Sequence, residues 1–211
     1  TIDPGLTLHF YDNKNTQLGQ TFAKDISDIR PNLRVNMQFK KNENLRFTYR
    51  KNTQFTDVNN ISEGYVFNNY NSIFRGNRGL EAAIVNSYNL NYRSINQFTF
   101  TNVYSNISYS KRENSIQSRA AIEGINSVRT ADNSIFPRET YSARARLDRR
   151  FKNIKINLSA NFRYSEFSNI INDVVNNAES FNQDYEASLE TNFRDKPCLL
   201  YTSDAADEWI G

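Results

Sequence analysis

The sequence predicts an all-β protein built from about nine long antiparallel strands. Apolar and polar residues alternate along much of the chain, and two residues is the side-chain period of a β-strand. The clearest such segment, residues 154–165, has twelve residues, whereas strands of globular proteins average about five or six. The connections between these segments are alternately short and long, so all the short turns are expected at one end of the sheet.

The strands follow from this alternation in chain order. Two are expected at 6–11 and 16–22, and the next two form a hairpin in which Leu33 to Phe39 and Leu45 to Tyr49 alternate with polar residues. The remaining five are expected at 84–93, 98–109, 140–149, 154–165 and 183–194. Within 98–109 the apolar residues change from even-numbered to odd-numbered positions between Phe100 and Val103. This change of face predicts a β-bulge.

The connections indicate the kind of sheet. Short turns are expected at 12–15, 41–44, 94–97 and 150–153, and longer loops at 23–30, 51–83, 110–139 and 165–182. Barrels of the bacterial outer membrane have tight periplasmic turns, long extracellular loops and strands that need roughly 9 to 11 residues to cross. We therefore predict a fragment of a large antiparallel transmembrane β-barrel. The alternative is a soluble sheet, because a sandwich also alternates apolar and polar residues.

Composition agrees with a barrel and excludes membrane helices. The mean hydropathy is −0.72 and the longest apolar run is about four residues (82–85), whereas a helical span needs roughly twenty. In a barrel the polar lumen face offsets the apolar lipid face, so a low mean hydropathy is expected. The 15 Phe and 12 Tyr residues also argue against a disordered chain.

The alternation assigns side chains to two faces. The lipid-facing positions are predicted to be Leu33, Val35, Phe39, Ile154, Ile156, Leu158 and Phe162. Charged residues such as Arg34, Arg46 and Arg163 fall on the opposite face, which a wide lumen hydrates. Aromatic residues near the predicted strand ends would form girdles at the bilayer interfaces: Tyr49, Tyr92, Phe98, Tyr109 and Tyr164.

Three segments carry a family resemblance. Residues 30–36 (RPNLRVN), 44–50 (NLRFTYR) and, after a long loop, 74–81 (FRGNRGLE) resemble the outer-membrane β-barrel and TonB-dependent receptor proteins of Bacteroidota-type bacteria. Arg78 stands where that family usually has Pro. The resemblance implies the later part of a barrel of about 22 strands. It further implies TonB-dependent uptake of a nutrient, with outer-membrane lipid, an unknown nutrient ligand and the TonB complex as partners, the last through a missing N-terminal region.

Loop 51–83 is the candidate ligand-contacting segment. It combines aromatic and basic side chains that can stack on and hydrogen-bond a ligand: Tyr65, Phe67, Tyr70, Phe74, Arg75 and Arg78. The alternative is a loop that packs on itself or on its neighbours. Two other functions also stay open, a non-transporting outer-membrane barrel and a secreted β-rich adhesion or binding module.

The sequence shows little that points to an enzyme. His9 is the only histidine, so a catalytic triad would have to use it, and we expect a lumen or turn-proximal side chain instead. No cofactor motif or metal-ligand spacing is present. Nucleic-acid binding is not expected, because the basic residues are spread along strands apart from a small cluster at Arg144, Arg146, Arg149 and Arg150.

The sequence predicts two parts, a partial barrel domain at residues 1–194 and a non-native tail at residues 195–211. One back-translation of residues 198–208 resembles a transposon-end adapter from sequencing libraries, and the alternative is a genuine acidic tail. Residues 198–211 contain the only Cys and three acidic residues, so the net charge without them rises from +3 to +6. We also expect the native protein to continue before Thr1, since no initiator Met is present.

Overall fold

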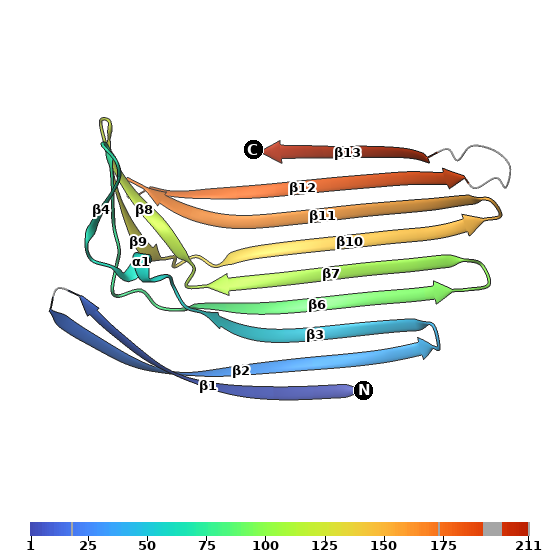
Figure 1. Cartoon of the computed structure of the whole chain (residues 1–211), viewed down its shortest axis with the longest axis horizontal. Coiled ribbons are helices and arrows are strands. Elements are labelled where there is room, and N and C mark those ends of the chain that lie inside the picture. The colour runs from blue at the N-terminus through green and yellow to red at the C-terminus, as the bar shows by residue number, and fades with distance from the viewer. Residues whose placement is uncertain (18, 173, 192–199, 211) are drawn as a thin grey trace.

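The computed structural model describes residues 1–17, 19–172, 174–191 and 200–210. Long strands lie side by side in one sheet, in the order β1-β2-β3-β6-β7-β10-β11-β12-β13, and each pairs antiparallel with its neighbours (Figure 1). Their bounds are β1 Ile2–Gln17, β2 Gln20–Lys40, β3 Glu43–Gln54, β6 Ala83–Asn96, β7 Thr101–Glu113, β10 Arg138–Phe151, β11 Ile154–Ile171, β12 Val174–Thr191 and β13 Leu200–Ile210.

The two ends of this sheet differ, as predicted. At one end, the turn end, residues 41–42, 97–100 and 152–153 join β2 to β3, β6 to β7 and β10 to β11. At the other end, the loop end, residues 55–82 and 114–137 form the long connections (Figure 1). These contain the helix α1 Val58–Ile61 and the short strands β4 Tyr65–Asn69, β5 Ser72–Arg75, β8 Ile116–Glu123 and β9 Asn126–Asn133.

The four short strands combine into a smaller sheet, which we call the loop cap. β4 pairs antiparallel with β5, and β8 pairs antiparallel with β9. Two parallel pairings unite them, β5 with β9 and β8 with the end of β11 at Ile170 and Ile171. The long connections are therefore hydrogen-bonded structure, and the count of strands rises from the nine expected to 13 in the described residues.

Two predicted connections are wrong at the N-terminal end. Residues 12–15 and 23–30 lie within β1 and β2, which pair continuously from Ile2 to Gln17. The turn between Gln17 and Gln20 contains Gly19 with a φ of +78°, a conformation that glycine adopts without steric cost. The Asn-rich segment 12–15 imitates a turn in sequence, although it lies on a hairpin that extends past the sheet.

Two further expectations are corrected. The predicted loop 165–182 is the extended part of a β11–β12 hairpin, which stays paired from Ile154 to Ile171. The predicted bulge in 98–109 is absent, because Phe98 and Phe100 precede β7 in the turn and the register of β7 is regular from Thr101. The phase change in the sequence therefore marks the strand's beginning.

Close packing is concentrated at the loop end. The buried residues among those described are Leu80, Ala83, Val85, Ala131, Asp28, Ser134 and Gly76. Along the rest of the sheet, large apolar side chains remain exposed, including Ile107 at 54% and Leu158 at 43%. A sheet of this size with one exposed apolar face needs another medium or partner to cover it.

The assignment of the tail stays a prediction. Residues 192–199 and 211 lie outside the described residues, and the backbone of β13 pairs with β12. Resequencing the parent gene from genomic DNA tests the assignment directly. We expect the reading frame to diverge from this chain after residue 197, and a genomic match through residue 211 would contradict it.

Candidate functional site

The apolar side chains form one continuous face across six neighbouring strands. The register aligns Val35 with Phe47, then Leu90, Ile107, Ala143 and Phe162 on successive strands. Leu33, Ile156 and Leu158 lie on the same face, since strand side chains alternate. Ile154 lies next to the turn end, two residues before Ile156, and therefore on the same face. Phe39 is 60% exposed and lies where the register between β2 and β3 shifts.

An aromatic row crosses this face near its loop end. It consists of one tyrosine from each of five neighbouring strands: Tyr49, Tyr88, Tyr109, Tyr141 and Tyr164. Successive ring centroids are 4.7 to 6.2 Å apart, within the range of favourable aromatic contacts. Three of the five were predicted as girdle residues. Of the other predicted girdle residues, Tyr92 lies further along β6 toward the turn end and Phe98 lies in a turn.

Polar residues begin directly beyond the aromatic row. The next cross-strand row on the same face, toward the loop end, is Lys51, Asn86, Lys111, Glu139, Glu166 and Glu179. Tyr49 donates a hydrogen bond to Asn86 (3.0 Å), and Tyr141 donates one to Glu139 (2.7 Å). The hydrogen bond to Glu113 (2.9 Å) raises the pKa of Lys111, so its ammonium stays charged. The change from apolar to charged side chains is thus completed within one row.

The apolar band runs obliquely across the sheet. On β1, Leu6, Leu8 and Phe10 lie on the loop side of the aromatic row, because Pro4 is the residue of β1 level with it. On β11, the residues of this face on the turn side of the row are apolar from Ile154 to Phe162, whereas Glu166 and Ser168 follow on its loop side. Strands that are tilted by about 40° to a flat slab produce such a drift.

The opposite face carries polar side chains that bond along the rows. Arg46 donates to Asn36 (2.7 Å), Asn106 to Asn91 (2.8 Å), and Arg144 to Asn161 (3.2 Å). One cross-strand row contains five of these residues: Asn36, Arg46, Asn91, Asn106 and Arg144. These bonds satisfy polar groups while leaving several of them exposed to water.

The predicted basic cluster is divided between the faces. Arg144 and Arg146 lie on the polar face, where Arg146 contacts Asp148 (2.9 Å). Arg149 lies on the apolar face, with its guanidinium 4.2 Å from the ring centroid of Phe151 on the same strand. Arg150 alternates in step with Arg144 and Arg146, so three of the four arginines share the polar face.

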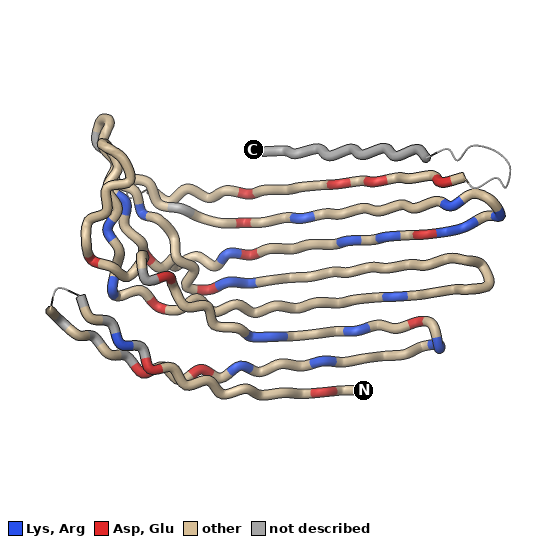
Figure 2. The backbone as a smooth tube through the Cα atoms, in the orientation of Figure 1, with Lys and Arg blue, Asp and Glu red and all other residues tan. Residues whose placement is uncertain are grey.

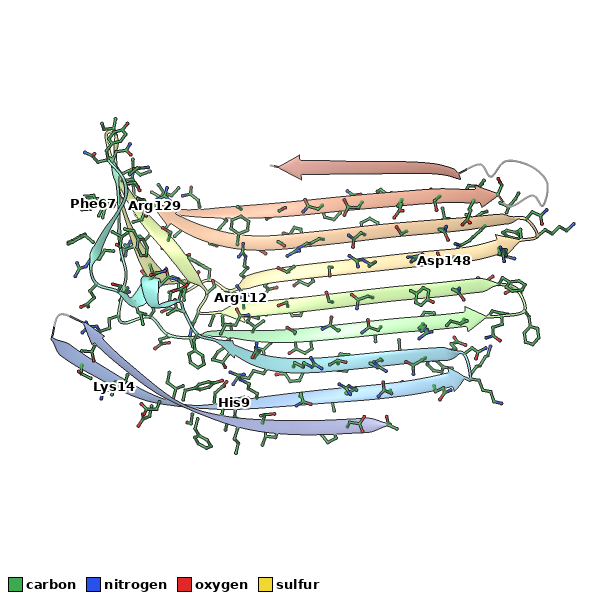
Figure 3. The ribbon with its side chains drawn as sticks, viewed as in Figure 1. His9, Lys14, Phe67, Arg112, Arg129 and Asp148 are labelled. Carbon is green, nitrogen blue, oxygen red and sulfur yellow. The ribbon has the colours of Figure 1, made fainter. Side chains whose placement is uncertain are left out.

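The loop cap holds the predicted ligand-contacting residues. Tyr65, Phe67 and Tyr70 are 64%, 71% and 91% exposed, and Arg75 lies over the ring of Tyr65 at 5.6 Å from its centroid. Figure 3 shows Phe67 of β4 and Arg129 of β9 in the same small sheet at the loop end. The structure thus brings Tyr65, Phe67 and Arg75 onto one sheet face.

Phe74 and Arg78 are placed differently. Phe74 is half-buried and alternates with Ile73 and Arg75, so it lies on the other face of the loop cap. Arg78 forms an ion pair with Glu63 (3.2 Å), and its side chain is 19% exposed. Both side chains are thus less accessible than those of Tyr65, Phe67 and Tyr70, and their role in ligand contact stays a prediction.

Sequence reasoning missed the residues that join the two long connections. The amide of Asn133 accepts a hydrogen bond from the backbone N–H of Glu81 (2.8 Å) and donates to the carbonyls of Glu81 (3.0 Å) and Asn114 (2.9 Å). At the other end of β8, Asn172 accepts from the N–H of Ile122 (2.7 Å). Single asparagines in an Asn-rich chain carry no signal that would distinguish them in advance.

His9 lies on β1, opposite Asp28 of β2. Its ring stacks on Tyr11 with centroids 5.8 Å apart. Its cross-strand neighbour Asp28 accepts a hydrogen bond from Arg30 (2.6 Å), which also donates to the Tyr11 hydroxyl (2.7 Å). These contacts anchor the β1–β2 hairpin. Within the part of the chain that the structure describes, no group of three metal-ligating side chains is found, and no helix there is long and apolar enough to span a bilayer.

Comparison with known families decides what this two-faced sheet is. The sequence profile described as "Outer membrane protein beta-barrel family" matches residues 8–199. The chain belongs to this family. Its location is accordingly the bacterial outer membrane, and the secreted module kept as an alternative is not supported.

Solved structures give the same fold. The FrpB iron transporter from Neisseria meningitidis (F3-3 variant) has a TM-score of 0.63 at 13% identity over 92% of this chain and 28% of that one. A double mutant of the Serratia marcescens hemophore receptor HasR, solved with its hemophore HasA and heme, has a TM-score of 0.57 at 11% identity over 97% and 41%. The chain thus spans well under half of either receptor. No curated protein matches the chain.

Proposed function

We propose that this family member is part of a receptor barrel that takes up a nutrient across the outer membrane by a TonB-dependent mechanism. The observation that carries the proposal is the combination of a two-faced sheet, the aromatic row at its edge and the ordered loop cap beyond that row. A barrel that only anchors or assembles does not need aromatic and basic side chains on an ordered external surface. The resemblance to TonB-dependent receptors supports the same conclusion.

The apolar face is the proposed lipid contact. Leu33, Val35, Ile154, Ile156, Leu158 and Phe162 share this face, and Phe39 completes the set next to the turn end. Every backbone group in a bilayer has to be paired, which the continuous antiparallel ladder provides between neighbouring strands. The aromatic row then lies at the outer interface and the charged row beyond it lies in water.

The loop cap is the proposed ligand-capture surface. Its exposed aromatic side chains offer flat faces for stacking, and the guanidinium of Arg75 lies beside Tyr65. Hydrogen bonds of Asn133 join the two long connections, and Asn172, directly after β11, accepts one from Ile122 of β8, so the exposed aromatic side chains of the cap are preorganised. The ligand would then move into the lumen under control of the TonB complex.

Genetic comparison tests the transport role. In the source bacterium, iron chelates and oligosaccharides are supplied one at a time as the nutrient. Deletion of the parent gene and deletion of TonB are expected to abolish growth on the same nutrient. The proposal would be contradicted if the strain without the parent gene failed to grow on a nutrient that the cell takes up without TonB. It would instead favour the non-transporting barrel.

Cysteine labelling tests the orientation. Residues 1–197 contain no cysteine, so single cysteines can be introduced there once any cysteines elsewhere in the full-length parent protein have been replaced by Ser. Tyr70→Cys, in the β4–β5 turn, is expected to react with a membrane-impermeant maleimide on intact cells.

The matched control is Lys41→Cys in the exposed β2–β3 turn. It is expected to react only after the outer membrane is permeabilised, because it lies at the turn end. Equal labelling of both cysteines on intact cells would remove the assignment of the loop end to the outside.

A further inference from the structure

The polar face contains a group of four arginines around one tyrosine. Arg46 of β3 lies in one cross-strand row with Asn91, Asn106 and Arg144, and Arg93 of β6 lies in the next row with Tyr104 and Arg146. These residues line a groove of about 780 Å³. We call Arg46, Arg93, Arg144 and Arg146 with Tyr104 the arginine patch.

Neutral groups, more than carboxylates, are the partners of this patch. Arg46 and Arg144 donate from Nε to the side-chain oxygens of Asn36 and Asn161. The guanidinium of Arg93 lies 5.9 Å from the ring centroid of Tyr104. Arg146 contacts the carboxylate of Asp148 and keeps its side chain 56% exposed. Within the described residues, carboxylates therefore neutralise only part of the positive charge of the patch.

Acidic residues of this face are gathered mainly on a different strand. On this face β12 carries Asp184, Glu186 and Glu190, and the strand has no basic residue, whereas Lys and Arg are frequent on β3 and β10 (Figure 2). Asp184, Glu186 and Glu190 each accept a hydrogen bond from a side chain of β11. The polar face thus has a basic region centred on the arginine patch and a separate acidic region on β12.

The chemistry of the patch fits an oxyanion. A guanidinium presents paired N–H donors that match the oxygens of carboxylate, sulfate or phosphate groups. Side-chain amides of Asn44, Asn91 and Asn106 line the same groove and can bind hydroxyl groups, and Tyr104 offers a ring face. We propose that the arginine patch is a binding site on the lumen wall for a hydrophilic solute that carries several oxyanion groups.

This inference rests on the proposed uptake function and specifies the substrate class. Its test uses the full-length parent receptor in lipid nanodiscs, with sucrose octasulfate as the anionic probe and sucrose as its uncharged counterpart. Octasulfate is expected to bind and sucrose is not. The triple variant Arg46→Gln, Arg93→Gln, Arg144→Gln is expected to weaken octasulfate binding at least tenfold at about 0.1 M salt.

A matched triple variant removes the same charge from the same face outside the patch: Arg34→Gln, Arg50→Gln, Arg163→Gln. It is expected to change the affinity less than threefold. Equal weakening by both variants would show a diffuse charge effect and overturn the site. A patch variant that lowers the melting temperature of the receptor while octasulfate binding stays unchanged would also overturn it, because the arginines would then hold carboxylates of the receptor itself.

The two proposals fail in different ways. If growth on the nutrient requires TonB but octasulfate does not bind the receptor, the uptake function stands and the arginine patch is rejected as an oxyanion site. If octasulfate binds through the patch but growth is independent of TonB, the binding site stands and the transport mechanism is rejected.

Discussion

Leu158→Arg is expected to destabilise the assembled barrel by about 2 to 4 kcal/mol. Leu158 lies between Leu147 and Ala187 on the apolar face, and it is 43% exposed in the open sheet. It lies near the middle of the apolar segment of β11, where an arginine would place its charge deep in the bilayer. Urea unfolding of the full-length parent barrel in lipid vesicles measures the change.

The neighbouring residue supplies the control. Asn157 lies on the polar face between Asp148 and Ser188, so Asn157→Arg places the same side chain in the hydrated lumen. Its expected cost is below about 1 kcal/mol, since lumen positions tolerate charge. Equal losses at positions 157 and 158 would contradict the assignment of the two faces.

Gly76→Ala is expected to disrupt the loop cap. A Cβ atom at this position would overlap the carbonyl oxygen of Ser62 and lie 2.7 Å from that of Asn60. Both neighbours are backbone atoms, held by hydrogen bonds from Gly76 to Ser62 (2.9 Å) and from Asn77 to Asn60 (2.7 Å). Relief of the overlap therefore displaces the connection between β5 and β6, at a typical cost of about 1 to 3 kcal/mol for overpacking.

Limited proteolysis on intact cells measures this effect, with cleavage in residues 55–82 expected to be at least tenfold faster than in the unmodified receptor. Gly64→Ala is the matched control, because its Cβ would meet only the hydroxyl of Ser62 at 3.8 Å, an ordinary contact. Resistance of Gly76→Ala equal to that of Gly64→Ala would show that the cap is not packed as described.

The long strands and their faces could be predicted from the sequence because the apolar period is local. Residues 154–165, 33–39 and 45–49 each alternate regularly, and β11, β2 and β3 contain them in the expected pairing. The alternation of short and long connections was sufficient to place the turns at 41–42 and 152–153 at one end. The family comparison agrees with this result.

The loop cap could not be predicted, because its contacts are distant in sequence. The parallel pairing of β5 with β9 joins Ile73 to Val128, and that of β8 with β11 joins Ala120 to Ile171. Neither pairing leaves a periodic signal in either segment. Likewise, residues 12–15, 23–30 and 165–182 are rich in Asn, Asp and Ser, so these parts of the β1–β2 and β11–β12 hairpins imitate loops in sequence.

The central claim is that alternate side chains of these strands face lipid and water. Spin labels placed singly at residues 154 to 164 of the full-length receptor in vesicles test it through their collisions with oxygen and with a water-soluble nickel chelate. We predict that even-numbered positions favour oxygen and odd-numbered positions favour nickel, with a period of two. High nickel accessibility at both sets of positions would contradict the account, because a soluble sheet would then explain the sequence.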